Sequence, residues 1–261
     1  MTEFMTEDFL LHSRTARQLY HGYAETEPIV DYHCHISPRD IAENHRFSSI
    51  TEAWLGGDHY KWRLMRACGI PERDVTGEES DLEKFTAYAK ALSRAPGNPL
   101  YHWSHLELRR YFGCRQVLSE QTAPDIFHHC QEILECDDSL RVQGLLQKSR
   151  VRVLCTTDDP ADDLHWHQVL HDSQFHSARV VPAMRPDRLM HIEGDDFSSY
   201  VEQLGESADM TIHTFADMCD ALKRRMDVFA EMGCRAADHA LDEVVYQPVP
   251  AASLERIFQK G

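Results

Sequence analysis

Two histidines separated by one residue, His33 and His35, close a short apolar segment of this 261-residue sequence. If residues 28–35 form a β-strand, alternate side chains share one face about 7 Å apart. Both imidazoles then reach one divalent metal ion, and Asp31 lies on the same side. A catalytic metal usually takes about three protein ligands and keeps a position open for water or substrate. The spacing alone fits two buried, hydrogen-bonded histidines equally well, so metal binding depends on the rest of the chain.

A second polar cluster occupies residues 57–66, with the sequence GDHYKWRLMR. His59 and Tyr60 in this cluster can polarise a carbonyl group or stabilise an oxyanion. Taken alone, the segment is more typical of an amphipathic helix with solvated charges. A chemical role for these two residues therefore needs independent support.

Four short runs predict buried strands, and helical patterns follow them, which indicates a parallel α/β fold. The interval between the first two runs is far longer than one crossover helix needs, so it must be a largely helical insertion. We expect an N-terminal helix with the first strand in residues 1–36, the insertion in 37–150, and further β/α units in 151–261. The four predicted strands are residues 28–35, 151–157, 178–182 and 234–239.

The ends of the predicted strands carry further candidates, because the carboxyl ends of parallel strands hold the active sites of such folds. Asp158 closes the second strand, and Asp238 and His239 close the fourth. Each of these can support a metal ligand, and each can equally cap a helix or form a turn. Arg185, just beyond the third strand, suits bidentate binding of a carboxylate, or else is an ordinary loop arginine.

The composition disfavours several classes of protein. A net charge of −16 argues against a nucleic acid or an anionic membrane surface as partner. No apolar run approaches the roughly 20 residues of a membrane-spanning helix, and the acidic residues 1–11 are atypical of a signal peptide. Eight scattered cysteines without a CxxC pair are typical of reduced thiols, so we expect a soluble, cytoplasmic protein. Neither a glycine-rich phosphate loop nor a GxSxG elbow occurs, so nothing supports nucleotide binding or serine hydrolysis.

Taken together, the motifs resemble the uronate isomerase (glucuronate isomerase) family, an outlying branch of the amidohydrolase superfamily. One such block would be weak, but the ordered set runs along the whole chain and is specific. The blocks are FMTEDFLL at 4–11, DYHCH at 31–35, GDHYKWRLMR at 57–66, GNPLYHWSHLELRRYFG at 97–113, TTDDP at 156–160, RPD at 185–187 and DHALD at 238–242.

The resemblance implies a (β/α)8 TIM-barrel fold, here about the first four β/α units with the helical insertion after the first strand. It implies interconversion of D-glucuronate with D-fructuronate, and of D-galacturonate with D-tagaturonate. His33 and His35 would bind a divalent metal, zinc by expectation, and His33, His59 and Tyr60 would be catalytic. Arg185, His59 and Tyr60 would bind the hexuronate, and a homo-oligomer is an open alternative. Further residues would support the ligands: Asp31, Asp158, Asp238 and His239.

The chain departs from the family in length, because members are much longer and their third metal ligand, an aspartate on the last barrel strand, has no counterpart here. Three hypotheses follow. The first is a uronate isomerase represented by its N-terminal portion. The second is an inactive or ligand-binding truncated fragment of that enzyme. The third is a metal-dependent hydrolase of the same superfamily, which the blocks at 57–66 and 97–113 disfavour.

Overall fold

The computed structural model of the chain describes residues 4–173, 175, 177–241 and 246–260. It forms two compact units, each described by itself below. Met1–Glu27 and Asn44–Lys148 form the helical unit, and Pro28–Glu43 and Ser149–Gly261 form the α/β unit. The sequence predicts boundaries at residues 36 and 150. The observed division differs because residues 1–27 group with the helices of the insertion.

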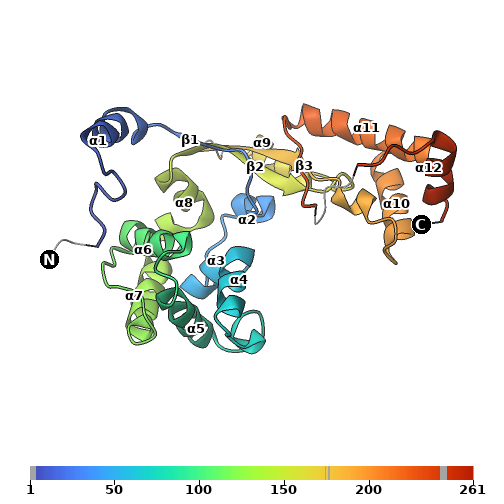
Figure 1. The fold of residues 1–261 in the computed structure, drawn as a ribbon. Helices are drawn as coiled ribbons and strands as arrows, with labels where there is room; N and C mark the ends of the chain where they lie inside the picture. The colour runs from blue at the N-terminus through green and yellow to red at the C-terminus, as the bar shows by residue number, and fades with distance from the viewer. Residues whose placement is uncertain (1–3, 174, 176, 242–245, 261) are drawn as a thin grey trace. The chain divides into compact units, whose positions relative to one another are not determined.

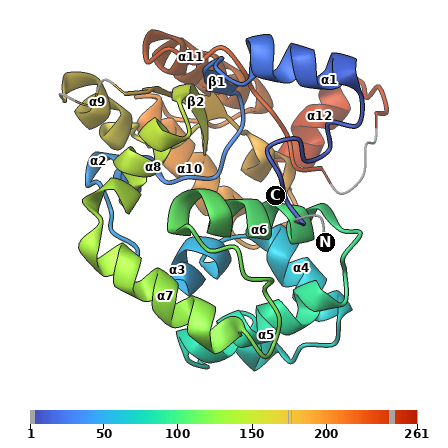
Figure 2. The same cartoon turned by 90° about the vertical axis from the view of Figure 1, so that its left-hand side faces the viewer.

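The helical unit contains residues 44–148 of the predicted insertion, and all of its described regular elements are helices. Helices α3, α5, α6 and α7 pack against one another in this unit (Figure 2). Short 3-10 turns at Glu72–Asp74 and Asp138–Leu140 join some of them, and a π-helical turn, Tyr20–Ala24, follows the first helix. The helices are α1 (Arg14–Leu19), α3 (Ile50–Leu55), α4 (His59–Ala67), α5 (Asp81–Ser93), α6 (Pro99–Phe112), α7 (Ala123–Cys136) and α8 (Val142–Lys148).

Local sequence signals place the ends of two of these helices. Ser80 caps α5 in a capping box, because its hydroxyl accepts from the backbone of Glu83 and the Glu83 carboxylate accepts from the backbone of Ser80. Asn98 caps α6, with Pro99 in the first turn. This helix ends at Gly113, whose φ of 62° only glycine adopts without strain.

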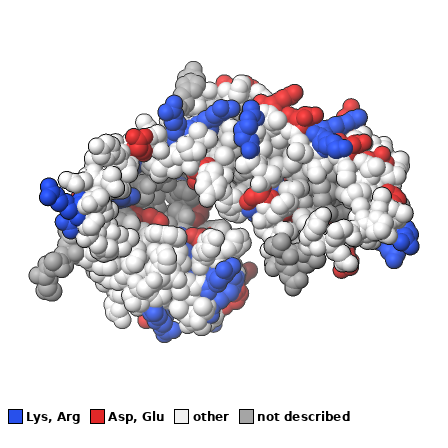
Figure 3. Space-filling view, turned by 45° about the horizontal axis from the view of Figure 1, so that its top comes forward, with Lys and Arg blue, Asp and Glu red and all other residues white. Residues whose placement is uncertain are grey.

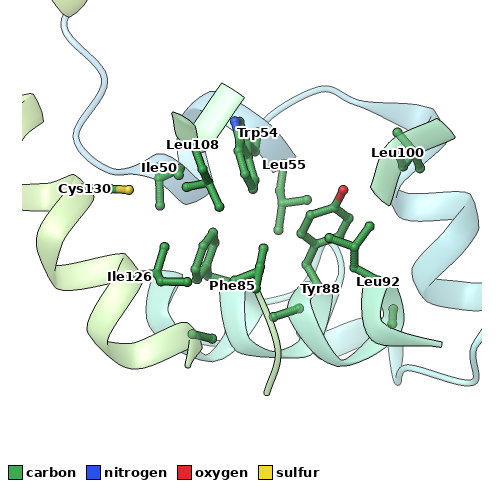
Figure 4. Packing of buried hydrophobic residues seen from close by; sticks show 14 of the residues in the cluster. Ile50, Trp54, Leu55, Phe85, Tyr88, Leu92, Leu100, Leu108, Ile126 and Cys130 are labelled. Carbon is green, nitrogen blue, oxygen red and sulfur yellow. The ribbon is translucent and has the colours of Figure 1, made fainter. Parts of the chain in front are cut away.

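One apolar core holds the helical unit together. Phe85 and Tyr88 of α5 are fully buried, and the Phe85 ring lies 5.8 Å from the rings of both Trp54 and Phe127. Figure 4 shows Trp54, Phe85, Leu108 and Ile126, which come from α3, α5, α6 and α7, packed in this core. The Tyr88 hydroxyl, 2.8 Å from the hydroxyl of Ser104, is a buried polar group of this core and is satisfied by that contact.

The α/β unit is built on a parallel sheet in the order β1-β2-β3 (Figure 1). Asp31 pairs with Leu154, and Asp158 pairs with Met184, so the carboxyl ends of the strands meet at one edge. The elements are β1 (Ile29–Asp31), α2 (Pro38–Ala42), β2 (Val151–Asp158), α9 (His165–Asp172), β3 (Arg179–Met184), a 3-10 turn at Asp187–Met190, α10 (Phe197–Ser207), α11 (Phe215–Glu231) and α12 (Ala251–Phe258).

Two strand predictions need correction. The first strand covers residues 29–31 and not 28–35, because its register shifts after Ile29 and the Asp31 carboxylate then accepts from the backbone N–H of His33. The run 234–239 is not a strand; within the described residues it makes a single parallel bridge, between Ala237 and Met184. Polar and alanine-rich, it buries too little apolar surface to be held as a full strand.

Helix α11 begins at Phe215, where Thr214 and Asp217 form a capping box that fixes its start. The chain leaves the helix at Gly233, with a φ of 97°. Asp242, the last residue of the 238–242 block, lies outside the described residues.

The helices and the charged surface of the structure bear on the expectations drawn from composition. None of the helices described is both long and apolar enough to cross a bilayer. Over the face seen in Figure 3, lysine and arginine side chains are interspersed with aspartate and glutamate. That face therefore offers no continuous basic surface to a polyanion.

Candidate metal and substrate site

The two histidines converge, although not for the reason that strand alternation gives. Both lie beyond the last residue of β1, and their Nε2 atoms are 3.1 Å apart with the rings nearly perpendicular. Two imidazole nitrogens on a tetrahedral zinc ion, each about 2.05 Å from it, are about 3.3 Å apart. The arrangement of His33 and His35 therefore fits a pair of ligands to one metal ion.

Backbone contacts with β2 hold this pair in place. Cys34, buried between the two histidines, donates its N–H to the carbonyl of Cys155 at 3.0 Å. Its own carbonyl accepts from the Thr157 hydroxyl at 2.9 Å. The segment is thus anchored along β2 after strand pairing by β1 has ended.

Asp238 lies on the other nitrogen of His33. Its Oδ2 is 3.0 Å from His33 Nδ1, so Nδ1 is the protonated nitrogen of the neutral ring and Nε2 keeps its lone pair. A carboxylate behind the ring is the usual partner of a histidine that binds a metal. The Arg185 guanidinium, and to a smaller degree the two neighbouring histidines, lower the pKa of Asp238 below its ordinary value. The carboxylate is therefore ionised at neutral pH.

Arg185 and His239 lie in the same cluster. Arg185 grips Asp238 in a fork, with Nε 3.1 Å from Oδ1 and Nη2 against Oδ2. His239 contacts a different carboxylate: its Nδ1 lies 2.7 Å from Oδ1 of Asp187. The cluster thus joins the residue after β1, the turn after β3 and the segment after α11.

Asp31 and Asp158 have other partners. The Asp31 carboxylate accepts from the backbone N–H of His33 and so shapes the loop, at 3.3 Å. Asp158 points into a buried cluster in which the Thr156 hydroxyl donates to Oδ2 at 2.7 Å and lies 2.8 Å from His167 Nε2. Because the hydroxyl has one proton to give, His167 must donate to it. Neither aspartate touches the His33 or His35 ring in these contacts.

Burial shifts both titratable groups of the Thr156 cluster towards their neutral forms. It raises the pKa of Asp158 from 3.8 to about 6 and lowers the pKa of His167 from 6.5 to about 4. The contribution of Asp158 to the free energy of unfolding therefore falls as pH rises from about 4 to 6. The contribution of His167 falls as pH drops from about 6.5 to 4. The two slopes oppose each other and largely cancel.

Single substitutions should separate these slopes. Relative to wild type, Asp158→Asn should make the α/β unit more stable at pH 6.5 than at pH 4.5, and His167→Gln should do the reverse. A shift of about two pKa units corresponds to roughly 3 kcal/mol, which sets the upper size of either effect. Urea denaturation at the two pH values measures it. Equal pH dependence in both variants would contradict the account.

His59 and Tyr60 lie in the helical unit, on the first turn of α4. The Asp58 carboxylate caps this turn by accepting from the backbone N–H groups of Tyr60 and Lys61, at 2.9 and 3.0 Å. The His59 ring meets the Trp62 ring edge-on at 4.9 Å, and the Tyr60 side chain is 70% exposed. Both predicted side chains are therefore fixed at their backbone and open at their polar ends, and their roles stay predictions.

Sequence reasoning missed three residues of these clusters. Asp187 stands in the quoted RPD block, so its motif was visible, but no role was attached to it. Thr156 likewise stands in the quoted TTDDP block without a role, and His167 gave no signal, because a strand threonine and a helix histidine meet only in the fold. Among the residues that the structure describes, no group of three or more His, Cys, Asp or Glu side chains is placed to hold a metal ion.

Comparison with known proteins decides the family. A sequence model of the family described as glucuronate isomerase matches residues 1–261. The chain belongs to this family. It is 50% identical over 260 residues to a uronate isomerase of Lachnospira eligens and 48% identical over 260 residues to one of Caldanaerobacter subterraneus. Those alignments cover the whole of this chain and 55% and 56% of the two relatives.

Solved structures agree. The uronate isomerase of Thermotoga maritima superimposes with a TM-score of 0.90 at 37% identity, covering 100% of this chain and 57% of that one. Glucuronate isomerase from Caulobacter crescentus gives 0.87 at 22% identity over 98% and 55%, which supports the fold alone. The α/β fold is thus that of uronate isomerase structures. The chain spans slightly more than half the length of the family members it matches.

Proposed function

We propose that this protein is a uronate isomerase that interconverts D-glucuronate with D-fructuronate and D-galacturonate with D-tagaturonate. The observation that carries the proposal is the convergence of His33 and His35 through Nε2, in a chain of the glucuronate isomerase family. The chain covers only 55% of its relative from Lachnospira eligens, so the family name alone does not establish the activity of this chain.

His33 and His35 would hold a divalent ion, with zinc as the expected metal, and we place the chain in the amidohydrolase superfamily as part of the same proposal. Imidazole nitrogen is an ordinary zinc ligand, and the Asp238 carboxylate behind His33 supplies the usual support. When bound, such an ion would polarise an oxygen of the substrate and stabilise negative charge that develops there.

The chain's own residues would share the remaining tasks. Moving a proton between C1 and C2 of the sugar places negative charge on the neighbouring oxygen, which a tyrosine hydroxyl can stabilise by donating a hydrogen bond. Tyr60 is proposed for that task and His59 for orienting the substrate. Arg185 has five N–H donors, of which two face Asp238, so it can also bind the substrate carboxylate.

We also propose that the sheet is part of a (β/α)8 barrel. The contact between His33 and Asp238 joins the end of β1 to a segment that pairs with β3. In a flat sheet those positions would lie three strand spacings apart, about 14 Å, too far for the two side chains to meet. Curvature towards a closed barrel accounts for the contact. Eight free cysteines support placement in the reducing cytoplasm.

A second function, binding of metal and hexuronate without turnover, is favoured by one observation. The convergent pair supplies two ligands, whereas catalytic zinc sites usually take three from the protein. The experiment is to strip the purified 261-residue chain of metal, add zinc, and follow ketose formation from D-glucuronate.

Zinc-dependent turnover that disappears in His35→Ala and persists in His171→Ala, an exposed histidine of α9, supports the isomerase. Tyr60→Phe should then lower kcat more than KM. Binding of zinc and D-glucuronate without turnover supports the second function. A chain that binds neither contradicts both.

A further inference from the structure

The turn after β3 and the segment after α11 make a reciprocal set of polar contacts. Arg185 grips the carboxylate of Asp238, as described above. Two residues further along each segment, Asp187 returns the contact: its Oδ2 accepts from the backbone N–H of Ala240 at 2.7 Å, and its Oδ1 lies 2.7 Å from His239 Nδ1. Arg185 and Asp187 also face each other, at 3.9 Å. We call these paired contacts the 185–187 clasp.

The segment that the clasp holds has little other support. It makes one bridge to β3, with backbone hydrogen bonds from Met184 to Ala236 and from Asp238 to Met184 at 3.3 and 3.2 Å. Ala236 and Ala237 are exposed, so apolar burial contributes little there. Side-chain contacts from residues 185 and 187 must therefore set the register of this segment.

The register matters because Asp238 reaches His33. Both oxygens of Asp238 are engaged by Arg185, which fixes the plane of the carboxylate. In that plane Oδ2 lies 3.0 Å from His33 Nδ1, so the proton of the neutral ring is kept on Nδ1. A slip of the segment by one residue would turn Asp238 to the other side and release the ring.

We propose that Arg185 and Asp187 are positioning residues that act through Asp238 on His33, holding its proton on Nδ1 so that Nε2, which faces His35 Nε2 at 3.1 Å, keeps its lone pair. In the contacts described above, Asp187 reaches Ala240, His239 and Arg185, and it does not touch the histidine pair. The inference rests on the proposed function only for the identity of what Nε2 binds. The position of the proton on His33 does not depend on that function.

Nitrogen NMR of the metal-free 261-residue chain at pH 8, where imidazole is neutral, tests the proposal. The His33 signals are identified by their loss in His33→Gln. In wild type, Nδ1 should be protonated and Nε2 unprotonated. Asp187→Ala and Arg185→Lys should both move the two nitrogens towards the average of the tautomers, and Asp187→Asn, which can still accept from Ala240, should move them less.

Zinc affinity, measured by competition with a chelator, is the second readout. Asp187→Ala should weaken it about 10-fold, the lower end of the range for residues behind a metal ligand. Asp172→Ala, which removes the partner of His171 at an exposed Asp–His pair of α9, should change neither readout. Circular dichroism checks folding, and Asp187→Asn and Arg185→Lys keep the test valid if Asp187→Ala does not fold.

Unchanged His33 nitrogens in well-folded Asp187→Ala and Arg185→Lys would overturn the clasp, as would a wild-type His33 already divided between tautomers. If the nitrogens move as expected but wild type binds no zinc, the clasp stands and the proposed metal role fails. The two failures are therefore distinguishable.

Discussion

Replacing His33 with alanine is expected to weaken zinc binding by this chain by at least roughly 100-fold, because removing a ligand costs more than altering a residue behind one. His33 and His35 present Nε2 atoms 3.1 Å apart, and neither can hold the ion well alone. His35→Ala should have a similar effect. Affinity is measured by competition with a chromophoric chelator at pH 8.

The matched control is His171→Ala. This exposed histidine of α9 also pairs with a carboxylate, Asp172 at 3.0 Å. We expect its loss to leave zinc affinity unchanged. Equal weakening in both variants would mean that zinc binds the acidic, histidine-rich surface without a defined site, and would contradict the metal role of the pair.

Replacing Phe85 with alanine is expected to destabilise the helical unit by about 3–5 kcal/mol, the range for truncating a buried phenylalanine. Phe85 is fully buried and packs between Trp54 and Phe127, so its removal leaves a cavity that three helices line (Figure 4). The measurement is urea denaturation followed by circular dichroism, with Phe85→Leu expected to cost less because it fills more of the space.

Tyr23→Ala serves as the control, because its side chain is 71% exposed and should contribute little. A loss below about 1 kcal/mol for Phe85→Ala would mean that the core collapses around the missing ring or is loosely packed. Either result would contradict the close packing of α3, α5 and α7 described here.

The helices were predictable where local chemistry decides them. Ser80 and Glu83, or Asn98 and Pro99, satisfy the free backbone groups of a helix start from within a few residues, so the sequence carries the signal directly. Strand boundaries depend instead on partners far along the chain. The run 234–239 looked like a strand by composition, yet it is held by side-chain contacts from the turn after β3.

The candidate site was predictable in its residue types and less so in its geometry. His33 and His35 do converge, but β1 ends at Asp31, so strand alternation was the wrong reason. Anchoring of Cys34 to β2 replaces it, and no spacing rule reports that contact. Asp158 was expected near the metal pair and instead faces His167, because which side of β2 packs on a helix depends on the tertiary fold.

The central claim is that His33 and His35 hold one metal ion through their imidazoles. X-ray absorption at the zinc edge of the zinc-loaded 261-residue chain measures this directly. The account predicts two imidazole nitrogens at about 2.0–2.1 Å, completed by oxygen, and their loss in the His33→Ala, His35→Ala double variant. Sulfur neighbours at about 2.3 Å from the chain's cysteines, or an oxygen-only shell, would contradict it.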